Sequence, residues 1–193
     1  MTSTNIINGF WLAWLISWTV AMIWSDRTDK RDAVGAELFF RVFFYVGLIL
    51  LFAFPAGTEN YAQMQLWRFE YVTNSVLVTA VAAGLLFTWW ARIHLGRLWS
   101  DRVVKKVGHR VVDTGPYRLV RHPIYSGLIF AALATAIQKA TLAALFGVSV
   151  ITLAFGIKAR REERFLRSEI GENAYDAYAR KTAMLVPFMR VGR

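Results

Sequence analysis

The sequence predicts an all-α integral membrane protein with five transmembrane helices. The 193-residue chain is 56% hydrophobic and has a mean hydropathy of +0.37, which is too apolar for an ordinary soluble domain of this length. Several apolar runs approach about 18 residues, the length that a helix needs to cross the hydrocarbon core of a bilayer. The chain has no cysteine, which excludes disulfides and thiolate metal sites.

The first half of the chain contains three predicted spans. They run from about Ile7 to Trp24, from about Leu38 to Phe54 and from about Val72 to Trp90. The third run leads into polar residues that can extend the same helix through Leu95. The first five residues carry no Lys or Arg and so lack the basic region of a signal peptide, which predicts that the first span is retained.

The second half begins with the longest polar stretch, from Arg92 to His122, which we predict to be a cytoplasmic connector. Two shorter apolar runs follow, Tyr125 to Ile137 and Leu142 to Ile157. Because only four residues separate them, they predict a tight helical hairpin that crosses the membrane and returns. The tail from Lys158 onward is polar, with aromatic residues at roughly helical spacing, and predicts an amphipathic helix.

We expect a single domain. Residues 1–71 hold two spans and an outer loop, and residues 72–193 hold the third span, the connector, the hairpin and the tail. The net charge of +10 orients this arrangement, because all of the 23 Lys and Arg residues except Arg68 and Lys139 fall on one side. The positive-inside rule makes that side cytoplasmic, with the N-terminus outside and the C-terminus inside. No basic element lies apart from the apolar spans, so nucleic-acid binding is not expected.

Residues 115–127, GPYRLVRHPIYSG, concentrate more chemistry than any other segment. Pro123 suits the first turn of a helix, where its missing N–H would have no helical partner in any case. The N-terminus of that helix would attract an anion such as a carboxylate or a phosphate. The alternative is a plain interfacial helix start whose arginines reach toward the headgroups.

A second polar cluster, Lys158 to Arg164, contains the paired carboxylates of Glu162 and Glu163. These carboxylates can hold a ribose, an amine or a cationic centre. The alternative is a solvated charge run beside the membrane. The three histidines of the chain lie 15 and 13 residues apart, which is not the spacing of metal ligands, so no metal site is predicted.

Three motifs follow one another between about residues 90 and 190. The central one is Gly115-Pro116-Tyr117 followed by Arg121-His122-Pro123-Ile124-Tyr125-Ser126-Gly127. Before it stands HLGRLWS at residues 94–100, and after it come Glu162-Glu163, Phe165-Leu166, Gly171, Tyr175, Tyr178 and Pro187-Phe188. Together these motifs resemble those of membrane methyltransferases, above all the isoprenylcysteine carboxyl methyltransferases and, more distantly, the phospholipid N-methyltransferases.

The resemblance implies methyl transfer from S-adenosylmethionine to a lipophilic acceptor at the membrane interface, most like isoprenylcysteine carboxyl O-methylation. The acceptor would be a prenylated or other small lipophilic molecule that enters laterally from the bilayer, so membrane lipid would surround the site. Residues 72–193 would then form the catalytic core, with the cofactor between the connector and the tail. Carried over by position, the cofactor-binding residues are His109, Arg110, Val111, Val112, Tyr117, His122, Pro123, Ile124, Tyr125 and Glu162.

On the same resemblance, we assign Arg121 and Glu163 to catalysis and Lys158 and Arg161 to the acceptor. Lys158 stands where the isoprenylcysteine enzymes have an arginine. Lysine keeps the positive charge but lacks the two-pronged fork that grips a carboxylate.

Three alternatives remain open. The chain can be a phospholipid amine N-methyltransferase, a membrane reductase that uses a nicotinamide cofactor, or a non-catalytic membrane scaffold. An amine acceptor has to lose a proton, so that His122 or a glutamate would then act as a base, whereas a carboxylate acceptor is already ionised.

Overall fold

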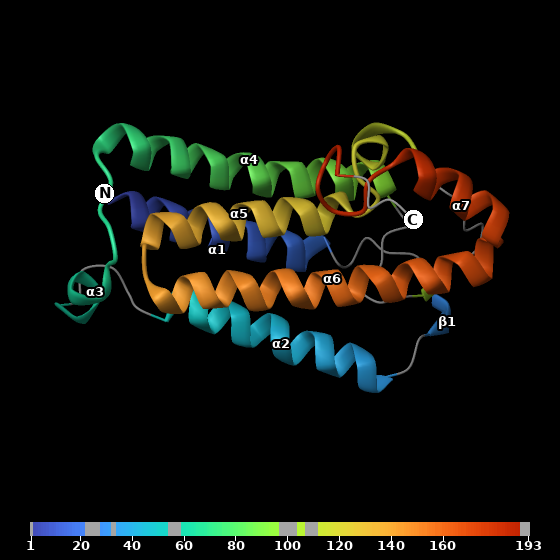
Figure 1. The fold of residues 1–193 in the computed structure, drawn as a ribbon, viewed down its shortest axis with the longest axis horizontal. Coiled ribbons are helices and arrows are strands. Elements are labelled where there is room, and N and C mark those ends of the chain that lie inside the picture. Colours follow the sequence, from blue (N-terminus) through green and yellow to red (C-terminus); the bar gives the residue numbers. More distant parts are fainter. Residues whose placement is uncertain are drawn as a thin grey trace.

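The structure, a computed structural model, describes residues 2–21, 28–31, 34–53, 59–96, 104–106 and 112–189. Five long helices lie side by side along the long axis of the molecule (Figure 1). They are α1 (Ser3–Ala21), α2 (Val34–Phe52), α4 (Tyr71–Leu95), α5 (Pro123–Lys139) and α6 (Leu142–Ile170). The shorter helices are α3 (Glu59–Met64), the 3₁₀ turn η2 (Gly115–Arg118) and α7 (Glu172–Lys181).

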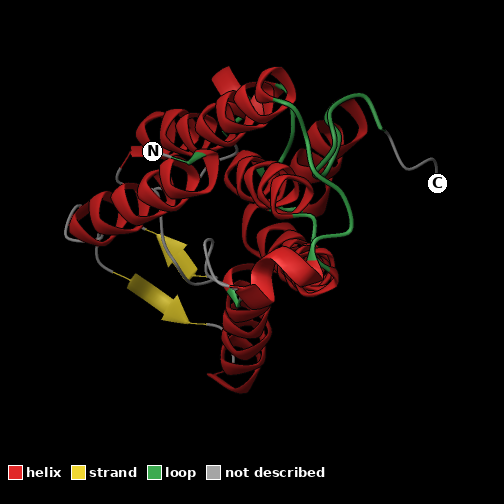
Figure 2. Ribbon diagram, turned by 90° about the vertical axis from the view of Figure 1, so that its left-hand side faces the viewer, coloured by secondary structure: helices red, strands yellow, loops and turns green. Residues whose placement is uncertain are grey.

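One small β-ribbon accompanies the helices, which the all-α prediction did not include. Strand β1 (Thr28–Arg31) pairs antiparallel with β2 (Val104–Lys106). Figure 2 shows the two strands beside the helix bundle. Because β1 lies between α1 and α2 and β2 lies between α4 and η2, the ribbon links two connections at the same end of the molecule.

Each predicted span corresponds to a helix, with ends that differ by a few residues. The largest difference is at α6, which continues without a break through the charged residues that the sequence analysis placed in a separate tail. Lys, Arg and Glu are good helix formers, so nothing in this run stops the helix. The stop comes at Gly171, whose φ of 102° is open to glycine but costly for other residues.

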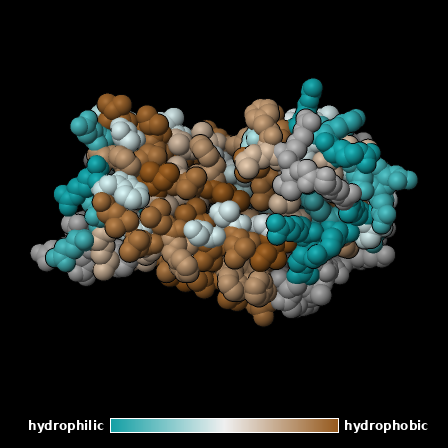
Figure 3. All heavy atoms as spheres, in the orientation of Figure 1, coloured by the Kyte–Doolittle hydropathy of each residue, from teal (hydrophilic) through white to brown (hydrophobic). Residues whose placement is uncertain are grey.

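Two of the described helices, α4 and Leu142–Glu169 of α6, are long and apolar enough to cross a membrane. The apolar helix Leu38–Phe52 is shorter. Figure 3 shows apolar residues covering the middle of the molecule and hydrophilic residues gathered at its ends, most of them near α7. Large apolar side chains such as Ile49 and Leu86, each 68% exposed, face outward. These features are those of a membrane protein.

Helix α5 lies between α4 and α6, and a two-residue link joins it to α6. Ala140 takes the left-handed conformation with φ 55° and ψ 34°, and its N–H donates to the carbonyl of Ala136. The Thr141 side chain then caps α6 by accepting a hydrogen bond from the N–H of Ala144. This link turns the chain back on itself, so that α6 returns to the end of the molecule where α5 began (Figure 1).

Indole hydrogen bonds hold α1 against this group of helices. Trp11 donates to the Thr135 hydroxyl of α5 at 3.0 Å, and Trp14 donates to the Thr88 hydroxyl of α4 at 2.7 Å. Both threonines are fully buried, so these bonds pair polar groups that would otherwise be costly in an apolar interior.

Candidate active site

The turn η2 is held against the end of α4 by the ring of His94. Gly115 has a φ of 56°, and a Cβ atom on it would lie 2.7 Å from His94 Cε1, so both the conformation and the space favour glycine. His94 Nε2 lies 2.9 Å from the Thr114 hydroxyl, and its ring stacks on Tyr117 at 6.3 Å between centroids. The buried position of Tyr117 follows from these contacts.

Backbone hydrogen bonds bring the segment after α7 back to the start of α5. Val120 pairs with Ala183 in a parallel bridge, and the N–H of Arg121 donates to the Ala183 carbonyl at 2.8 Å. The N–H of His122 donates to the Met184 carbonyl at 3.2 Å. Residues more than sixty positions apart therefore form one wall of the site.

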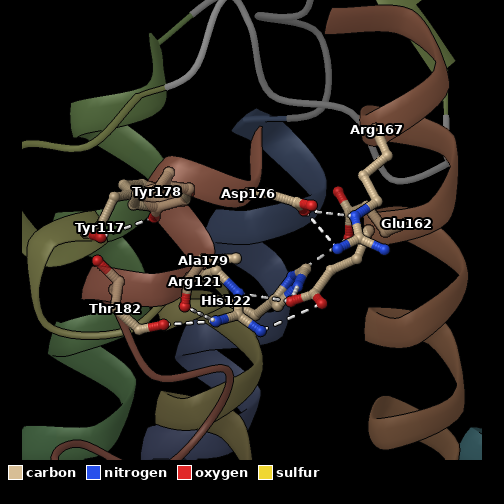
Figure 4. Close-up of polar contacts among 10 residues, drawn as sticks. Tyr117, Arg121, His122, Glu162, Arg167, Asp176, Tyr178, Ala179 and Thr182 are labelled. Carbon is tan, nitrogen blue, oxygen red and sulfur yellow. Dashed lines mark hydrogen bonds and ion pairs between the residues drawn. The ribbon is translucent and has the colours of Figure 1, made fainter. Parts of the chain in front are cut away.

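Arg121 joins α6 to α7 (Figure 4). Its Nε donates to Glu163 Oε1 at 2.7 Å and its Nη2 donates to Glu163 Oε2 at 3.1 Å, a bidentate ion pair. Its Nη1 donates to the carbonyls of Ala179 and Thr182 at the end of α7. The guanidinium therefore uses its planar fork to fix two helices relative to the start of α5.

His122 lies between the two carboxylates of α6. Its Nδ1 is 3.5 Å from Glu162 Oε2 and its Nε2 is 3.2 Å from Glu163 Oε1. Burial alone would lower the pKa of this histidine, but the hydrogen bonds and charges of Glu162 and Glu163 outweigh burial and raise the pKa to about 9. The ring is therefore an imidazolium at neutral pH, with both nitrogens donating.

Tyr125 connects this ion cluster to a group of aromatic rings. Its hydroxyl donates to Glu162 Oε2 at 2.9 Å, and its ring stacks on His122 at 5.3 Å with an interplanar angle of 3°. On its other side it stacks on Phe155 at 4.8 Å. Glu162 thus lies where two helices, an imidazolium and an aromatic stack meet.

The structure places the remaining predicted residues around this cluster. Tyr117 is buried, and its carbonyl accepts a hydrogen bond from the Tyr178 hydroxyl at 2.7 Å. Lys158 is only 8% exposed, and its ammonium lies 4.2 Å from the centre of the Phe40 ring. Pro123 and Ile124 begin α5, Arg161 is partly buried on α6, and Val112 is partly buried before η2. His109, Arg110 and Val111, and residues 97–100 of the first motif, lie outside the described residues.

Sequence reasoning missed one buried cation near the site. Arg92 is fully buried at the end of α4, where it donates to the carbonyls of Gly96 at 3.0 Å and Ala21 at 2.8 Å. An arginine at the edge of an apolar span is a signal that could have found it. The carbonyl partners of Arg121 have no such signal, since every residue carries a backbone carbonyl.

The cluster can hold a ligand that carries both signs of charge. The Glu162 carboxylate, whose side chain is 30% exposed, can meet a positive group of a ligand, and aromatic rings offer flat surfaces to a cation. Helix α5 starts with proline, and His122, its N-cap residue, makes no side-chain capping bond. Its N-terminus therefore attracts negative charge beside the same cluster.

Comparison with known proteins relates the chain to one family of methyltransferases. The model of the isoprenylcysteine carboxyl methyltransferase family matches residues 76–168. The cobalt-zinc-cadmium resistance protein CzcN of Cupriavidus metallidurans is 31% identical over 163 residues, which cover 72% of this chain and 73% of that protein.

Two plant proteins extend the comparison. A probable protein-S-isoprenylcysteine O-methyltransferase of Oryza sativa subsp. japonica is 33% identical over 113 residues, 58% of this chain and 53% of that protein. Protein-S-isoprenylcysteine O-methyltransferase B of Arabidopsis thaliana is 26% identical over 115 residues, 58% of each chain. The chain therefore matches little more than half of the length of these plant relatives.

Proposed function

The chain belongs to the isoprenylcysteine carboxyl methyltransferase family, and on this premise we propose that it methylates a lipophilic carboxylate at the membrane interface with S-adenosylmethionine as donor. The observation that carries the proposal is the cluster of Arg121, His122, Tyr125, Glu162 and Glu163. All five lie within the residues that match the family. Residues about forty positions apart, at the start of α5 and on α6, are brought together there next to an aromatic stack.

The residues present fit S-adenosylmethionine by the chemistry of their donor set. The carboxylate of Glu162 suits the positive groups of the cofactor, and the N-terminus of α5, with Pro123 and Ile124, suits its carboxylate. The rings of Tyr117 and Tyr125 suit a flat or cationic group. We include His109, Arg110, Val111 and Val112 in the proposed cofactor site on the resemblance alone.

The cofactor supplies an electrophilic methyl group on a sulfonium. A carboxylate acceptor is already ionised at neutral pH, so the protein does not have to provide a base. Its residues have to orient the two reactants and exclude water, which are the main sources of rate for such a transfer. Lys158 and Arg161 would attract the acceptor carboxylate.

Arg121 and Glu163 contribute through position in this proposal. Their bidentate pair and the carbonyl contacts of Arg121 hold His122 and Glu162 in place. Removing Glu163 leaves the largely buried Arg121 without its carboxylate, and removing Arg121 leaves Glu163 with His122 alone, and both changes are costly. We therefore interpret the catalytic assignment of these two residues as positioning of the groups that touch the ligands.

We further propose that all five long helices cross the membrane, with α5 and α6 as a hairpin. The N-terminus would lie outside and the C-terminus in the cytoplasm. The support is that all Lys and Arg residues except Arg68 and Lys139 fall in the segments assigned to the cytoplasmic side. The site would then receive the polar cofactor from the cytosol and a prenylated acceptor from the bilayer.

The first test measures ligand binding. S-Adenosylhomocysteine should raise the thermal unfolding midpoint of the purified protein, because a ligand that binds only the folded state stabilises it. A nicotinamide dinucleotide should have no effect. Glu162→Gln should remove the protection, whereas Glu70→Gln, an exposed glutamate at the opposite end of α4, should keep it. Protection by the nicotinamide alone would contradict the proposal and favour a reductase.

The second part of the test identifies the acceptor. Membranes that contain the protein are incubated with S-adenosylmethionine carrying a labelled methyl group. The label should enter a lipophilic fraction and be released by mild base, as from a carboxyl ester. Base-stable label in phospholipid would instead show amine methylation.

A further inference from the structure

The chain after α7 runs along the start of α5 toward the apolar middle of the molecule. The carbonyl of Ala183 accepts a hydrogen bond from the N–H of Arg121, just before α5. The carbonyl of Leu185 accepts one from the Ser126 hydroxyl, in the first turn of α5, at 2.6 Å. Figure 1 shows this segment turning back from α7 beside the start of α5. The next residues, 186–189, therefore begin level with the first turn of that helix.

Residues 186–189 form a turn with an unfavourable conformation at its tip. The N–H of Met189 donates to the carbonyl of Val186 at 3.2 Å, so that Pro187 and Phe188 are the two central residues. Phe188 has a φ of 66°, in the left-handed region that is strained for a residue with a bulky side chain. Glycine or asparagine usually occupies the second central position of such a turn. The fold therefore holds an aromatic ring where a smaller residue would be less strained.

The side chains of this turn face outward. Phe188 is 94% exposed, so packing within the described part of the protein does not account for its strained conformation. Val186 and Met189 are also exposed, as is Leu119, which precedes the bridge of Val120 with Ala183. An apolar patch of this kind is unfavourable in water, and strain persists where function requires it. The patch is therefore expected to have a partner.

Two features indicate that the partner is a lipid surface. The first is continuity: Phe130, one helical turn beyond Ser126, is 50% exposed and belongs to the outward apolar surface of α5. The second is charge, because Arg118, Arg180 and Lys181 are exposed on the elements that pair at this wall, and cations there attract anionic headgroups. An aromatic residue with cations nearby is typical of a segment at the membrane interface.

We propose that residues 186–189 dock on the bilayer as an interfacial anchor, with Phe188 inserted among the headgroups and upper acyl chains beside the candidate site. The partner is an anionic lipid surface. The anchor would hold residues 183–185 at a fixed depth, and with them the backbone of Arg121 and His122. This inference rests on exposure, conformation and charge, so it does not depend on the proposed methyl transfer.

The test measures where the turn lies relative to a bilayer. Because the chain has no cysteine, Val186→Cys can carry a single fluorescent label while Phe188 stays in place. In nanodiscs that contain phosphatidylglycerol, a lipid with a nitroxide near its headgroup should quench this label, and iodide in the water should not. The control is the same label on Glu172→Cys, an exposed position at the start of α7, which should respond to iodide alone.

Variants at the tip show whether the Phe188 ring causes the insertion. Phe188→Asn suits the left-handed conformation but removes the ring, so the label at position 186 should lose its quenching by lipid and become open to iodide. Phe188→Leu, which stays apolar, should keep most of the quenching by lipid. Neither variant should change the response of the label at position 172, which reports that the fold is intact. Nanodiscs of phosphatidylcholine alone should weaken the quenching by lipid.

Several outcomes would overturn the inference. One is that iodide quenches the label at position 186 as strongly as the label at position 172. Another is that Phe188→Asn keeps the quenching by lipid. Shielding of position 186 from both quenchers would show that the turn packs on protein, either on its own chain or on a second copy. An equal response with and without phosphatidylglycerol would overturn the choice of an anionic surface.

Discussion

At the scale of single residues, the charge of His122 holds the cluster together. Without its proton, Glu162 and Glu163 would be two neighbouring carboxylates, of which Glu163 keeps its pair with Arg121 and Glu162 keeps the hydrogen bond from the Tyr125 hydroxyl. Like charges at this separation repel, and burial strengthens the repulsion. The imidazolium therefore works as the counterion between the two glutamates, in addition to any contact with a ligand.

This role predicts a specific pH dependence of stability. The pKa of His122 in the folded protein, about 9, is above its ordinary value of 6.5. Its stabilisation is therefore fully present below about pH 6.5 and is lost as the pH rises through 9, a change on the order of 2–3 kcal/mol. The thermal unfolding midpoint in detergent should fall between pH 6.5 and pH 10.

The matched variants separate His122 from other groups that titrate. His122→Gln should flatten the decline in the unfolding midpoint over this pH range, because the residue that titrates is gone. His94→Gln should keep the decline, because the His94 ring contacts Thr114 rather than a carboxylate. An equal decline in wild-type protein and His122→Gln would show that another group causes it.

At the scale of elements, the crossing of α4 and α5 sets the position of the site along the helix axes. Gly84 and Gly127 face each other there, and a Cβ atom on Gly127 would lie 2.7 Å from the Gly84 carbonyl oxygen. Small residues at helix crossings allow this close approach in membranes. Gly127 lies two residues after Tyr125, so the crossing also fixes where the start of α5 presents its rings.

Substitution at this crossing should be costly. Gly127→Ala should lower the free energy of unfolding by about 1–3 kcal/mol, and with it the thermal unfolding midpoint. The reason is that a backbone carbonyl cannot move aside as a flexible side chain can. Gly156→Ala in α6 is the control: a Cβ atom there meets nothing within 4 Å. The control should be neutral or stabilising by up to about 1 kcal/mol, since alanine favours helix over glycine. Equal behaviour of the two variants would contradict the crossing.

At the scale of the whole molecule, the proposed topology separates two ends. The N-terminus and α3 lie at one end, and α7 and the candidate site lie at the other (Figure 1). Since the chain has no cysteine, single cysteines can be introduced without background labelling.

Two such variants test the orientation. A membrane-impermeant thiol reagent should label Met64→Cys from the outer side of intact cells, because Met64 is 47% exposed. It should label Glu172→Cys, an exposed position at the start of α7, only in inverted vesicles. The proposed topology has an odd number of spans between the two positions and so places them on opposite sides of the membrane. Labelling of both positions from the same side would contradict it.

Part of this structure could be predicted from the sequence because it depends on local pattern. Apolar runs of sufficient length located the long helices, and Pro123 marked the start of α5 because its ring suits a first turn. The pair of His122 and Glu162 came from the family motifs. The physical reading of those residues alone left a solvated charge run as the alternative.

Other features depend on packing that no local pattern encodes. The contact between Phe40 and Lys158 requires a particular rotation of α2 against α6. The close approach of Gly47 in α2 to Gly147 in α6 sets this rotation. The carbonyls that bind Arg121 carry no sequence signature. The unbroken course of α6 past Lys158 was missed because a change from apolar to charged residues was interpreted as the end of an element, although both classes form helix.

Because α6 is unbroken, its length can be compared directly with the thickness of a membrane. Its 29 residues extend about 43 Å at 1.5 Å per residue, whereas the hydrocarbon core of a bilayer is about 30 Å thick. Glu162 comes about 30 Å along the axis from Leu142, so this part of α6 is as long as the hydrocarbon core is thick. In the proposed topology, the length of α6 would therefore set the depth at which the acceptor meets the cofactor, and lipids that are too short or too long would have to adapt to it.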